Sequence, residues 1–272
     1  AITGAGSGMG QQLAVLLAKA GCHVSLSDVN EKGLAETVEL VKPYNVRVTS
    51  KKVNVAKLEE VRTWAEETVQ NHGSVNMIFN NAGVALGSTV EGSNYEDLEW
   101  IMGINYWGVV YGTKEFLPYL KKTGEGHIIN TSSLFGLTAQ PTQSAYNSTK
   151  FAVRGFTESL RQELDIENSG VSALSVHPGG IRTNIANDAR MSDSIKSMGM
   201  NPEKSAKAFN KLLRMPAEEA AQQILDAVLK NKRRLLIGND AKTLDLIQRV
   251  LPTGYQRITA MATKLSKRLE PK

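Results

Sequence analysis

Thr3-Gly4-Ala5-Gly6-Ser7-Gly8-Met9-Gly10 is the stretch that decides the fold, because it joins a short apolar run to an amphipathic segment. Glycine permits a tight turn, and the N–H groups that open a helix can cradle a pyrophosphate. The spacing is T-G-x-x-x-G-x-G and not the common G-x-G-x-x-G. Although a glycine-rich stretch alone is often only a turn, its place between the first expected strand and the first expected helix favours nucleotide binding.

Short apolar runs alternate with amphipathic segments along the rest of the chain. The runs predict buried strands at 1–3, 23–27, 46–53, 75–80, 127–131, 171–177 and 235–237. The amphipathic segments predict helices at 9–19, 31–41, 57–71, 95–122, 146–166 and 217–229. This alternation predicts an α/β fold in one domain over residues 1–239, with about seven strands in a Rossmann-type doubly wound parallel sheet and helices on both faces. Because the first run is so short, we expect the natural chain to begin before Ala1.

The composition excludes several classes of protein. With 272 residues, the chain is long enough to bury one sizeable core. The single cysteine, Cys22, excludes an internal disulfide framework, and four scattered histidines show no metal-ligand spacing. No apolar run is long enough to span a bilayer, and the observed start does not resemble a secretory signal. We therefore expect a soluble, cytoplasmic protein with no metal site.

The positive charge is concentrated near the end of the sequence. Residues 230–272 carry eleven Lys/Arg against three Asp/Glu, whereas the rest of the chain holds twenty-one against twenty-four. Two apolar stripes at helical spacing lie in this region, first Leu244, Ile247 and Leu251, and then Tyr255, Ile258, Ala262, Leu265 and Leu269, with Lys264, Lys267 and Arg268 between the last ones. We expect residues 240–272 to form a basic helical extension that docks on its own or a partner subunit. Peripheral membrane contact is the alternative, and no nucleic acid is expected.

Asp28 ends the second expected strand, eighteen residues after Gly10. A carboxylate at this position can accept hydrogen bonds from the adenosine ribose hydroxyls, and it would repel a 2′-phosphate. The nearest downstream cation is Lys32, and Asn30 is available to cap the next helix in place of Asp28. Asp28 therefore favours NAD over NADP.

Tyr146-Asn147-Ser148-Thr149-Lys150 places a tyrosine and a lysine four residues apart, on one face of an expected helix. A free phenol has a pKa of about 10, so it needs a nearby cation to act as a base at neutral pH. Lys150 could supply that cation. Taken alone, the pair is equally compatible with an ordinary solvated helix face.

Six short motifs together make the chain resemble a classical short-chain dehydrogenase/reductase. They are the T-G-x-x-x-G-x-G turn, Asn80-Asn81-Ala82-Gly83, Asn105-Tyr106-Trp107-Gly108, Thr131-Ser132-Ser133, Tyr146 to Lys150, and Pro178-Gly179-Gly180-Ile181-Arg182-Thr183, in the order of that family. The resemblance implies a catalytic tetrad of Asn105, Ser133, Tyr146 and Lys150. Ser133 is chosen over Ser132 because the family places its serine thirteen residues before the tyrosine; the residues alone leave both open.

Each member of the implied tetrad has a physical role. Ser133 would hold the substrate oxygen, and Tyr146 would exchange the proton while hydride passes between substrate and nicotinamide. Lys150 would lower the pKa of Tyr146 and bond the nicotinamide ribose. Asn105 would interrupt the long helix so that a water can link Lys150 to solvent. By position, Leu134 and Phe135, with Ser133 and Tyr146, are the expected substrate contacts.

The remaining motifs are expected to bind the cofactor. The predicted contacts are Thr3, Gly4, Ser7, Gly8, Met9, Gly10, Asp28, Asn54, Val55, Asn80, Ala82, Gly83, Tyr146, Lys150, Pro178, Gly179, Ile181 and Thr183. One departure from the family is Asn54, which stands where an acidic residue usually faces the adenine. Its amide oxygen can still accept a hydrogen bond from the adenine amino group.

The substrate is expected to be a fairly apolar alcohol or ketone, because residues 184–215, where the family has a mobile lid, are rich in methionine. An equally open interpretation is that these methionines are core. A homodimer or homotetramer is expected from the resemblance. The alternative function is a nucleotide-binding regulator or scaffold that lost turnover, while an extended-type epimerase or dehydratase would need a larger carboxyl-terminal domain.

Overall fold

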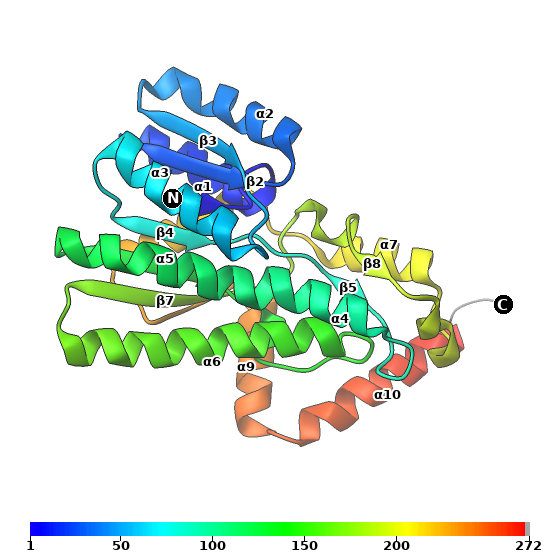
Figure 1. Ribbon diagram of the computed structural model, residues 1–272. Coiled ribbons are helices and arrows are strands. Elements are labelled where there is room, and N and C mark those ends of the chain that lie inside the picture. The colour runs from blue at the N-terminus through cyan, green and yellow to red at the C-terminus, as the bar shows by residue number, and fades with distance from the viewer. Residues whose placement is uncertain (270–272) are drawn as a thin grey trace.

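Within residues 1–269, which the structure describes (206 and 266–269 through their backbone alone), the computed structural model shows one parallel sheet of seven strands (Figure 1). The strand order is β3-β2-β1-β4-β6-β7-β9, and all neighbours are parallel. The strands are β1 (Ile2–Thr3), β2 (Val24–Asp28), β3 (Val48–Lys52), β4 (Met77–Asn80), β6 (Gly126–Thr131), β7 (Val171–Pro178) and β9 (Arg234–Ile237). The predicted Rossmann-type doubly wound sheet is confirmed.

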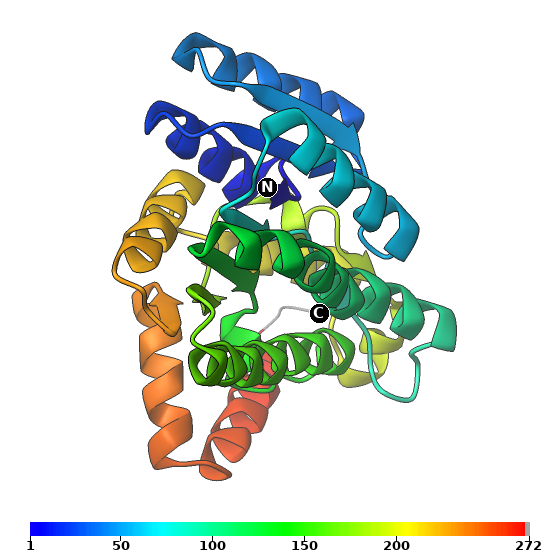
Figure 2. The same cartoon turned by 60° about the vertical axis from the view of Figure 1, so that its left-hand side comes forward.

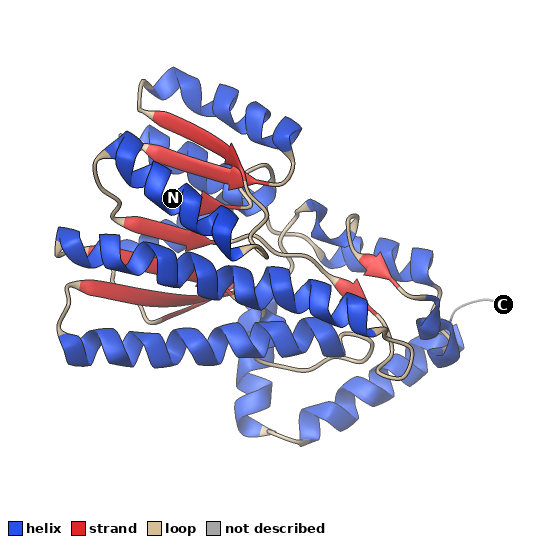
Figure 3. Ribbon diagram, viewed as in Figure 1, coloured by secondary structure: helices blue, strands red, loops and turns tan. Residues whose placement is uncertain are grey.

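Helices cover both faces of the sheet (Figure 3). One face carries α1 (Gly8–Lys19), α2 (Glu31–Val41) and α8 (Ala217–Leu229), and the other carries α3 (Leu58–His72), α5 (Gly108–Thr123) and α6 (Ser144–Glu167). Side chains alternate along each strand, so Ile78 and Phe79 of β4 enter opposite cores. This two-sided burial explains the apolar runs of the central strands. The strand expected at 46–53 is the exception, because β3 lies at the edge of the sheet and its residues are exposed or only half-buried.

The helix predicted at 95–122 is interrupted in the middle. It consists of α4 (Tyr95–Met102), a π-helical turn at Gly103–Trp107, and α5. Asn105 lies in the π-helical turn, where the widened backbone brings its buried side chain toward Thr149 of α6. The interruption expected at Asn105 is therefore present.

Residues 184–215 form a segment of short helices and one short strand between β7 and α8. Within it, β8 (Arg190–Met191) pairs in parallel with β5 (Leu86–Gly87), and α7 (Pro202–Leu212) follows. Arg190 holds this segment against α4, because its guanidinium lies 3.6 Å from the Trp100 ring centroid and 2.6 Å from the Asp97 carboxylate. The small second sheet was not predicted, since two-residue strands leave no periodic signal in the sequence.

The C-terminal extension forms two helices, α9 (Asn239–Val250) and α10 (Gly254–Leu269), which meet at a sharp turn at one end of the molecule (Figure 2). The Tyr255 hydroxyl accepts a hydrogen bond from Ala139 N at 3.1 Å, so α10 contacts the loop that follows the candidate catalytic serine. Ile258, Met261 and Leu265 are more than half exposed. Of the stripe residues named above, the side chains of Lys267, Arg268 and Leu269 lie outside the described part of the structure. No helix among the described residues is long and apolar enough to cross a membrane.

Candidate active site

The glycine turn lies at the carboxyl end of β1 and opens α1. Gly4 and Gly8 have φ of +65° and +53°, a region that side chains with a Cβ rarely adopt. Ser7 is the N-cap residue of α1 but makes no side-chain cap hydrogen bond, and the first turn contains no acidic residue. The N–H groups at the start of α1 are therefore available for an anion, as a pyrophosphate site requires.

Asp28 lies directly beside this turn. Its Oδ2 accepts a hydrogen bond from Gly6 N at 2.8 Å, and its Oδ1 accepts one from Asn30 N at 2.9 Å. Asn30 itself caps α2 by accepting from Gly33 N at 3.1 Å. Asp28 therefore is not the helix cap, and each of its oxygens retains a further lone pair for a ribose hydroxyl.

A cleft of about 350 Å³ runs along the carboxyl ends of the strands. Ten of the predicted cofactor contacts line it, namely Gly4, Ser7, Gly8, Met9, Asp28, Asn54, Val55, Ala82, Gly83 and Thr183. The cleft thus extends from the glycine turn, past the ends of β2 and β3, to the turn after β4. An open doubly wound sheet is expected to bind its ligand at this edge.

Other predicted contacts support the cleft from behind. Thr3 Oγ1 accepts hydrogen bonds from Asn81 N and Ala82 N at 2.9 and 3.0 Å. Gly10 allows α1 to approach the turn, because a Cβ there would lie 2.0 Å from Gly4 O. Asn80 is buried and donates to Thr113 and Asn130 at 3.1 and 2.8 Å. These residues shape the backbone and do not line the cleft.

Asn54 has a local role that sequence reasoning did not anticipate. Its Oδ1 accepts a hydrogen bond from Ala56 N at 3.1 Å, and its backbone N donates to Glu60 Oε2 at 2.8 Å. This backbone bond is the largest cause that lowers the pKa of Glu60. The acidic group near the expected adenine site is therefore Glu60, which reaches the backbone of Asn54 from α3.

A dinucleotide fits this cleft on independent grounds. Among the described side chains, Asn80 Oδ1 and Asn81 Oδ1 are buried acceptors without a hydrogen-bond partner. Asn81 lines the cleft, so a ribose hydroxyl is a suitable donor for it. At Gly83, a Cβ would lie 3.3 Å from Asn105 Oδ1 and 3.4 Å from Lys150 Nζ. Glycine thus keeps open the place where the cleft meets the candidate catalytic residues.

Tyr146 and Lys150 project from α6 beside the end of β6. Lys150 Nζ donates to Thr131 O at 3.0 Å and lies 5.6 Å from the centroid of the Tyr146 ring. Burial lowers the pKa of Lys150 to about 8. Burial also raises the pKa of Tyr146 to about 12, and a hydrogen bond with Ser133 opposes that rise only in part. Burial therefore dominates the pKa of the phenol here, and the lowering of that pKa by Lys150 stays a prediction.

The two neighbouring serines have different partners. Ser132 is buried and donates its hydroxyl to Lys150 O at 2.8 Å. Ser133 Oγ accepts from Phe135 N at 3.1 Å and hydrogen-bonds the Tyr146 phenol. The geometry therefore separates the two serines that the residues alone left open, and it places Ser133 beside the tyrosine.

Asn105 is completely buried and joins α6 to the cleft wall. Its Oδ1 accepts from Val84 N at 2.8 Å, and its Nδ2 donates to Val84 O and Thr149 Oγ1 at 2.9 and 3.2 Å. Phe135 packs edge-on against Tyr146, with ring centroids 6.0 Å apart, and lies 6.5 Å from Phe209 of α7. The predicted tetrad is thus assembled with an aromatic wall on its outer side.

The turn after β7 is supported by a residue that sequence reasoning missed. Asp240, at the start of α9, accepts a hydrogen bond from Gly180 N at 2.7 Å. A Cβ on Gly179 would lie 2.1 Å from Asp240 Oδ1, so a larger residue there would displace the Asp240 carboxylate. Ile181 is buried and forms an isolated bridge with Met215. No local sequence signal pairs Asp240 with residues sixty positions earlier; only the three-dimensional contact identifies it.

Comparisons with known proteins agree with this geometry. The family model for short chain dehydrogenases matches residues 1–194. The oxidoreductase SadH of Mycobacterium tuberculosis, so named, is 44% identical over 260 residues, covering 95% of this chain and 92% of its own. A Burkholderia phymatum short chain dehydrogenase/reductase in complex with NAD has a TM-score of 0.85 at 26% identity and covers 92% of both chains. An alcohol dehydrogenase from Thermococcus sibiricus, complexed with 5-hydroxy-NADP, shares the fold with a TM-score of 0.71 at 24% identity, covering 87% of this chain and 94% of its own. The chain belongs to the short-chain dehydrogenase/reductase family.

Proposed function

We propose that this protein transfers a hydride between NAD(H) and a fairly apolar alcohol or ketone, with Tyr146 as the general acid/base. The observation that carries the proposal is the meeting of Tyr146, Ser133 and Lys150 next to Gly83, a lining residue of the cleft that also contains the glycine turn at a helix N-terminus. When bound, the nicotinamide cofactor supplies or accepts the hydride. A binding-only protein would need the cleft but not the buried tyrosine, serine and lysine.

The chain's own residues handle the proton and the orientation. The hydroxyls of Ser133 and Tyr146 hold the substrate oxygen between them, which fixes the carbonyl or alcohol carbon for reaction. With a pKa of about 12, the Tyr146 phenol keeps its proton at neutral pH, so it can donate that proton to a developing alkoxide during reduction. Lys150 supplies a buried donor beside the ring, and Asn105 fixes the wall between α6 and the cleft.

The surroundings of Tyr146 support an apolar substrate. Tyr146 belongs to an apolar cluster with Leu86 and Ile101, against which Phe135 and Ile185 pack. Ile185 comes from the predicted lid at 184–215, and so does Phe209, which lies against Phe135. A substrate that reaches the phenol therefore passes aromatic and aliphatic side chains, whose burial favours apolar groups.

The preference for NAD rests on Asp28, whose carboxylate occupies the cleft next to the glycine turn. We also propose a homo-oligomer. Trp107 and Phe151 are 46% and 40% exposed on the helices that carry the site, which supports a subunit contact there. Light scattering on the wild type and on Trp107→Ser would test it, and a monomeric wild type would refute it.

Tyr146→Phe tests the function directly. Removing the hydroxyl should lower kcat for ketone reduction by about 10²- to 10⁴-fold, the usual contribution of a general acid, while the NADH dissociation constant stays within a few-fold. The matched control is Tyr95→Phe, because Tyr95 is 81% exposed and does not line the cleft. A Tyr146→Phe variant with wild-type turnover would exclude the mechanism, and a wild type that binds NADH but turns over no ketone or alcohol would favour the regulatory alternative.

A further inference from the structure

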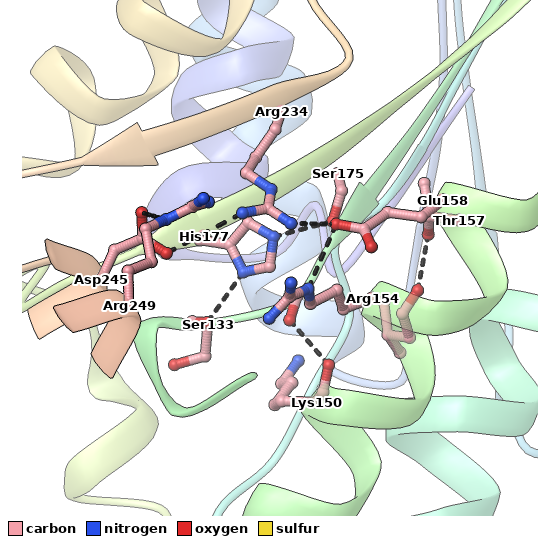
Figure 4. A network of polar contacts seen from close by, with 12 residues as sticks. Ser133, Lys150, Arg154, Thr157, Glu158, Ser175, His177, Arg234, Asp245 and Arg249 are labelled. Carbon is pink, nitrogen blue, oxygen red and sulfur yellow. Dashed lines mark hydrogen bonds and ion pairs between the residues drawn. The ribbon is translucent and has the colours of Figure 1, made fainter. Parts of the chain in front are cut away.

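His177, on β7, makes a pair of buried hydrogen bonds that the proposed mechanism does not use (Figure 4). Its side chain is fully buried, with Nδ1 3.0 Å from Ser133 O and Nε2 2.9 Å from Ser175 Oγ. A carbonyl oxygen can only accept, so Nδ1 must carry the ring proton. Nε2 must then accept from the Ser175 hydroxyl, and the two partners together fix one neutral tautomer.

The protonation state of His177 agrees with this assignment. Its pKa is lowered to about 4, mainly by burial and also by the charges of Arg234 and Arg154, against which the Ser133 carbonyl and Glu158 act. Figure 4 shows these arginines with Glu158 beside the imidazole. Glu158 is held by Arg234 and, at 3.1 Å, by Arg154. At neutral pH the ring is therefore uncharged and donates through Nδ1 alone.

The hydrogen bond from His177 to Ser133 O takes the place of a backbone hydrogen bond to β7, because the ladder of the sheet ends one residue earlier. The ladder between β6 and β7 ends with Ser132 N donating to Val176 O at 2.8 Å. Ser133 is the next residue and leaves the sheet, capping the short turn Leu134–Gly136. Its carbonyl then accepts from Gly136 N at 2.9 Å, within its own turn, and from His177 across the gap to β7. Of these two donors, only His177 ties Ser133 to the rest of the sheet.

We propose that His177 is a positioning residue for the reaction: through Nδ1–H it holds the Ser133 peptide group so that the Ser133 hydroxyl faces Tyr146 and the substrate oxygen. This inference rests on the proposed function. The positioning role requires a hydrogen-bond donor at the place of Nδ1, and a bulky buried side chain without such a donor would not fulfil it. Asparagine places its amide N–H₂ close to the position of Nδ1, whereas the longer glutamine places it close to that of Nε2.

The comparison of His177→Asn with His177→Gln is the test. We expect His177→Asn to retain kcat within about 3-fold, and His177→Gln to lose at least about 10-fold in kcat with an unchanged KM for NADH. Both substitutions remove the buried ring, so a purely structural role would lower activity and thermal stability in parallel in the two variants. Equal kcat losses that follow the melting temperature, or no loss in either variant, would overturn the proposal.

His127 provides a matched control in the neighbouring strand β6. Its ring is only partly buried and also bonds a serine, Ser172, at 2.6 Å, but it lies at the opposite end of the strand from Ser133. His127→Asn and His127→Gln should not differ in kcat. Nitrogen-15 NMR of the wild-type imidazoles gives a readout independent of turnover: a proton on Nε2 of His177 would overturn the inference even if no substrate is found, whereas absence of turnover in the wild type with a proton on Nδ1 would count against the proposed function only.

Discussion

Exchange of Asp28 for asparagine should change which nicotinamide cofactor the protein binds. In the structure, the two carboxylate oxygens accept from Gly6 N and Asn30 N at 2.8 and 2.9 Å, so the negative charge is fixed at the edge of the cleft. Asparagine keeps the size and one accepting oxygen, but it removes the charge. The glycine turn should therefore remain folded, with a loss of about 1–3 kcal/mol for the one hydrogen bond that is no longer made.

The magnitude follows from electrostatics and hydrogen bonding. Two like unit charges about 4–5 Å apart repel by about 3–4 kcal/mol at an effective dielectric constant of about 20. Removing this repulsion should tighten binding of NADPH, which carries a 2′-phosphate, by about 10²- to 10³-fold. NADH loses a charge-assisted hydrogen bond between its ribose and Asp28, so its binding should weaken by about 10-fold. The ratio of the two dissociation constants should thus change by about 10³- to 10⁴-fold.

Fluorescence titration with NADH and NADPH measures both constants without requiring a substrate. The control is Asp188→Asn, which removes another carboxylate from the lining of the same cleft. Asp188 lies in the segment after β7, away from the glycine turn in the chain, and should leave the ratio unchanged. If wild-type protein binds NADPH as tightly as NADH, or if Asp188→Asn changes the ratio as much as Asp28→Asn does, the assigned role of Asp28 is wrong.

Two further predictions concern stability and the C-terminal helix. His177 has a folded pKa of about 4 against an ordinary value of 6.5, so the unfolded chain binds more protons between these values, and stability should fall as pH drops through this window. Between pH 7.5 and pH 4.5, the free energy of unfolding measured with urea should fall by roughly 2 kcal/mol less in His177→Asn than in wild type. An equal fall in the two proteins would contradict the assignment. On α10, Ile258 and Leu265 are 55% and 56% exposed, and we expect this surface to dock on a subunit. Replacing both residues by serine should therefore change the oligomeric state measured by light scattering, whereas Ile166→Ser, whose target is 84% exposed elsewhere, should not. An unchanged oligomeric state together with loss of sedimentation with anionic vesicles would instead assign the surface to a membrane.

Much of the fold follows from sequence because its signals are local. Each strand of the large sheet overlaps one of the predicted runs, and residues such as Ile78 and Phe79 can be apolar on both sides because both faces of the sheet are covered. The glycine turn is similarly local, since its positive φ values are a property of Gly4 and Gly8 themselves. By contrast, β5 and β8 join residues about a hundred positions apart through two-residue strands, and no periodicity could indicate their pairing.

The candidate site also contains residues that local sequence signals identify and residues that only long-range contacts reveal. Spacing and family order were sufficient to name Ser133 and Tyr146, and the structure brings them together. Asn80, predicted as a cofactor contact, supports the site from below by bonding Thr113 and Asn130, because its side chain points into the buried space between β4, β6 and α5. Asp240 and His177 were missed for a related reason: each acts on a turn far away in the sequence, through one hydrogen bond to a backbone group.

Tyr146 and Lys150 show why residue spacing alone does not determine the chemistry of a pair. Four-residue spacing on α6 sets the proximity of Lys150 to the ring, at 5.6 Å, and this attraction alone would favour the phenolate. Burial opposes this attraction because it disfavours the charged form of each group. It raises the pKa of Tyr146 to about 12 and lowers that of Lys150 to about 8. Burial depends on Phe135, Ile185 and the other side chains that cover the pair, which come from distant segments. The packing that surrounds Tyr146 therefore also sets the pKa of its phenol, and this contribution cannot be read from the four-residue spacing alone.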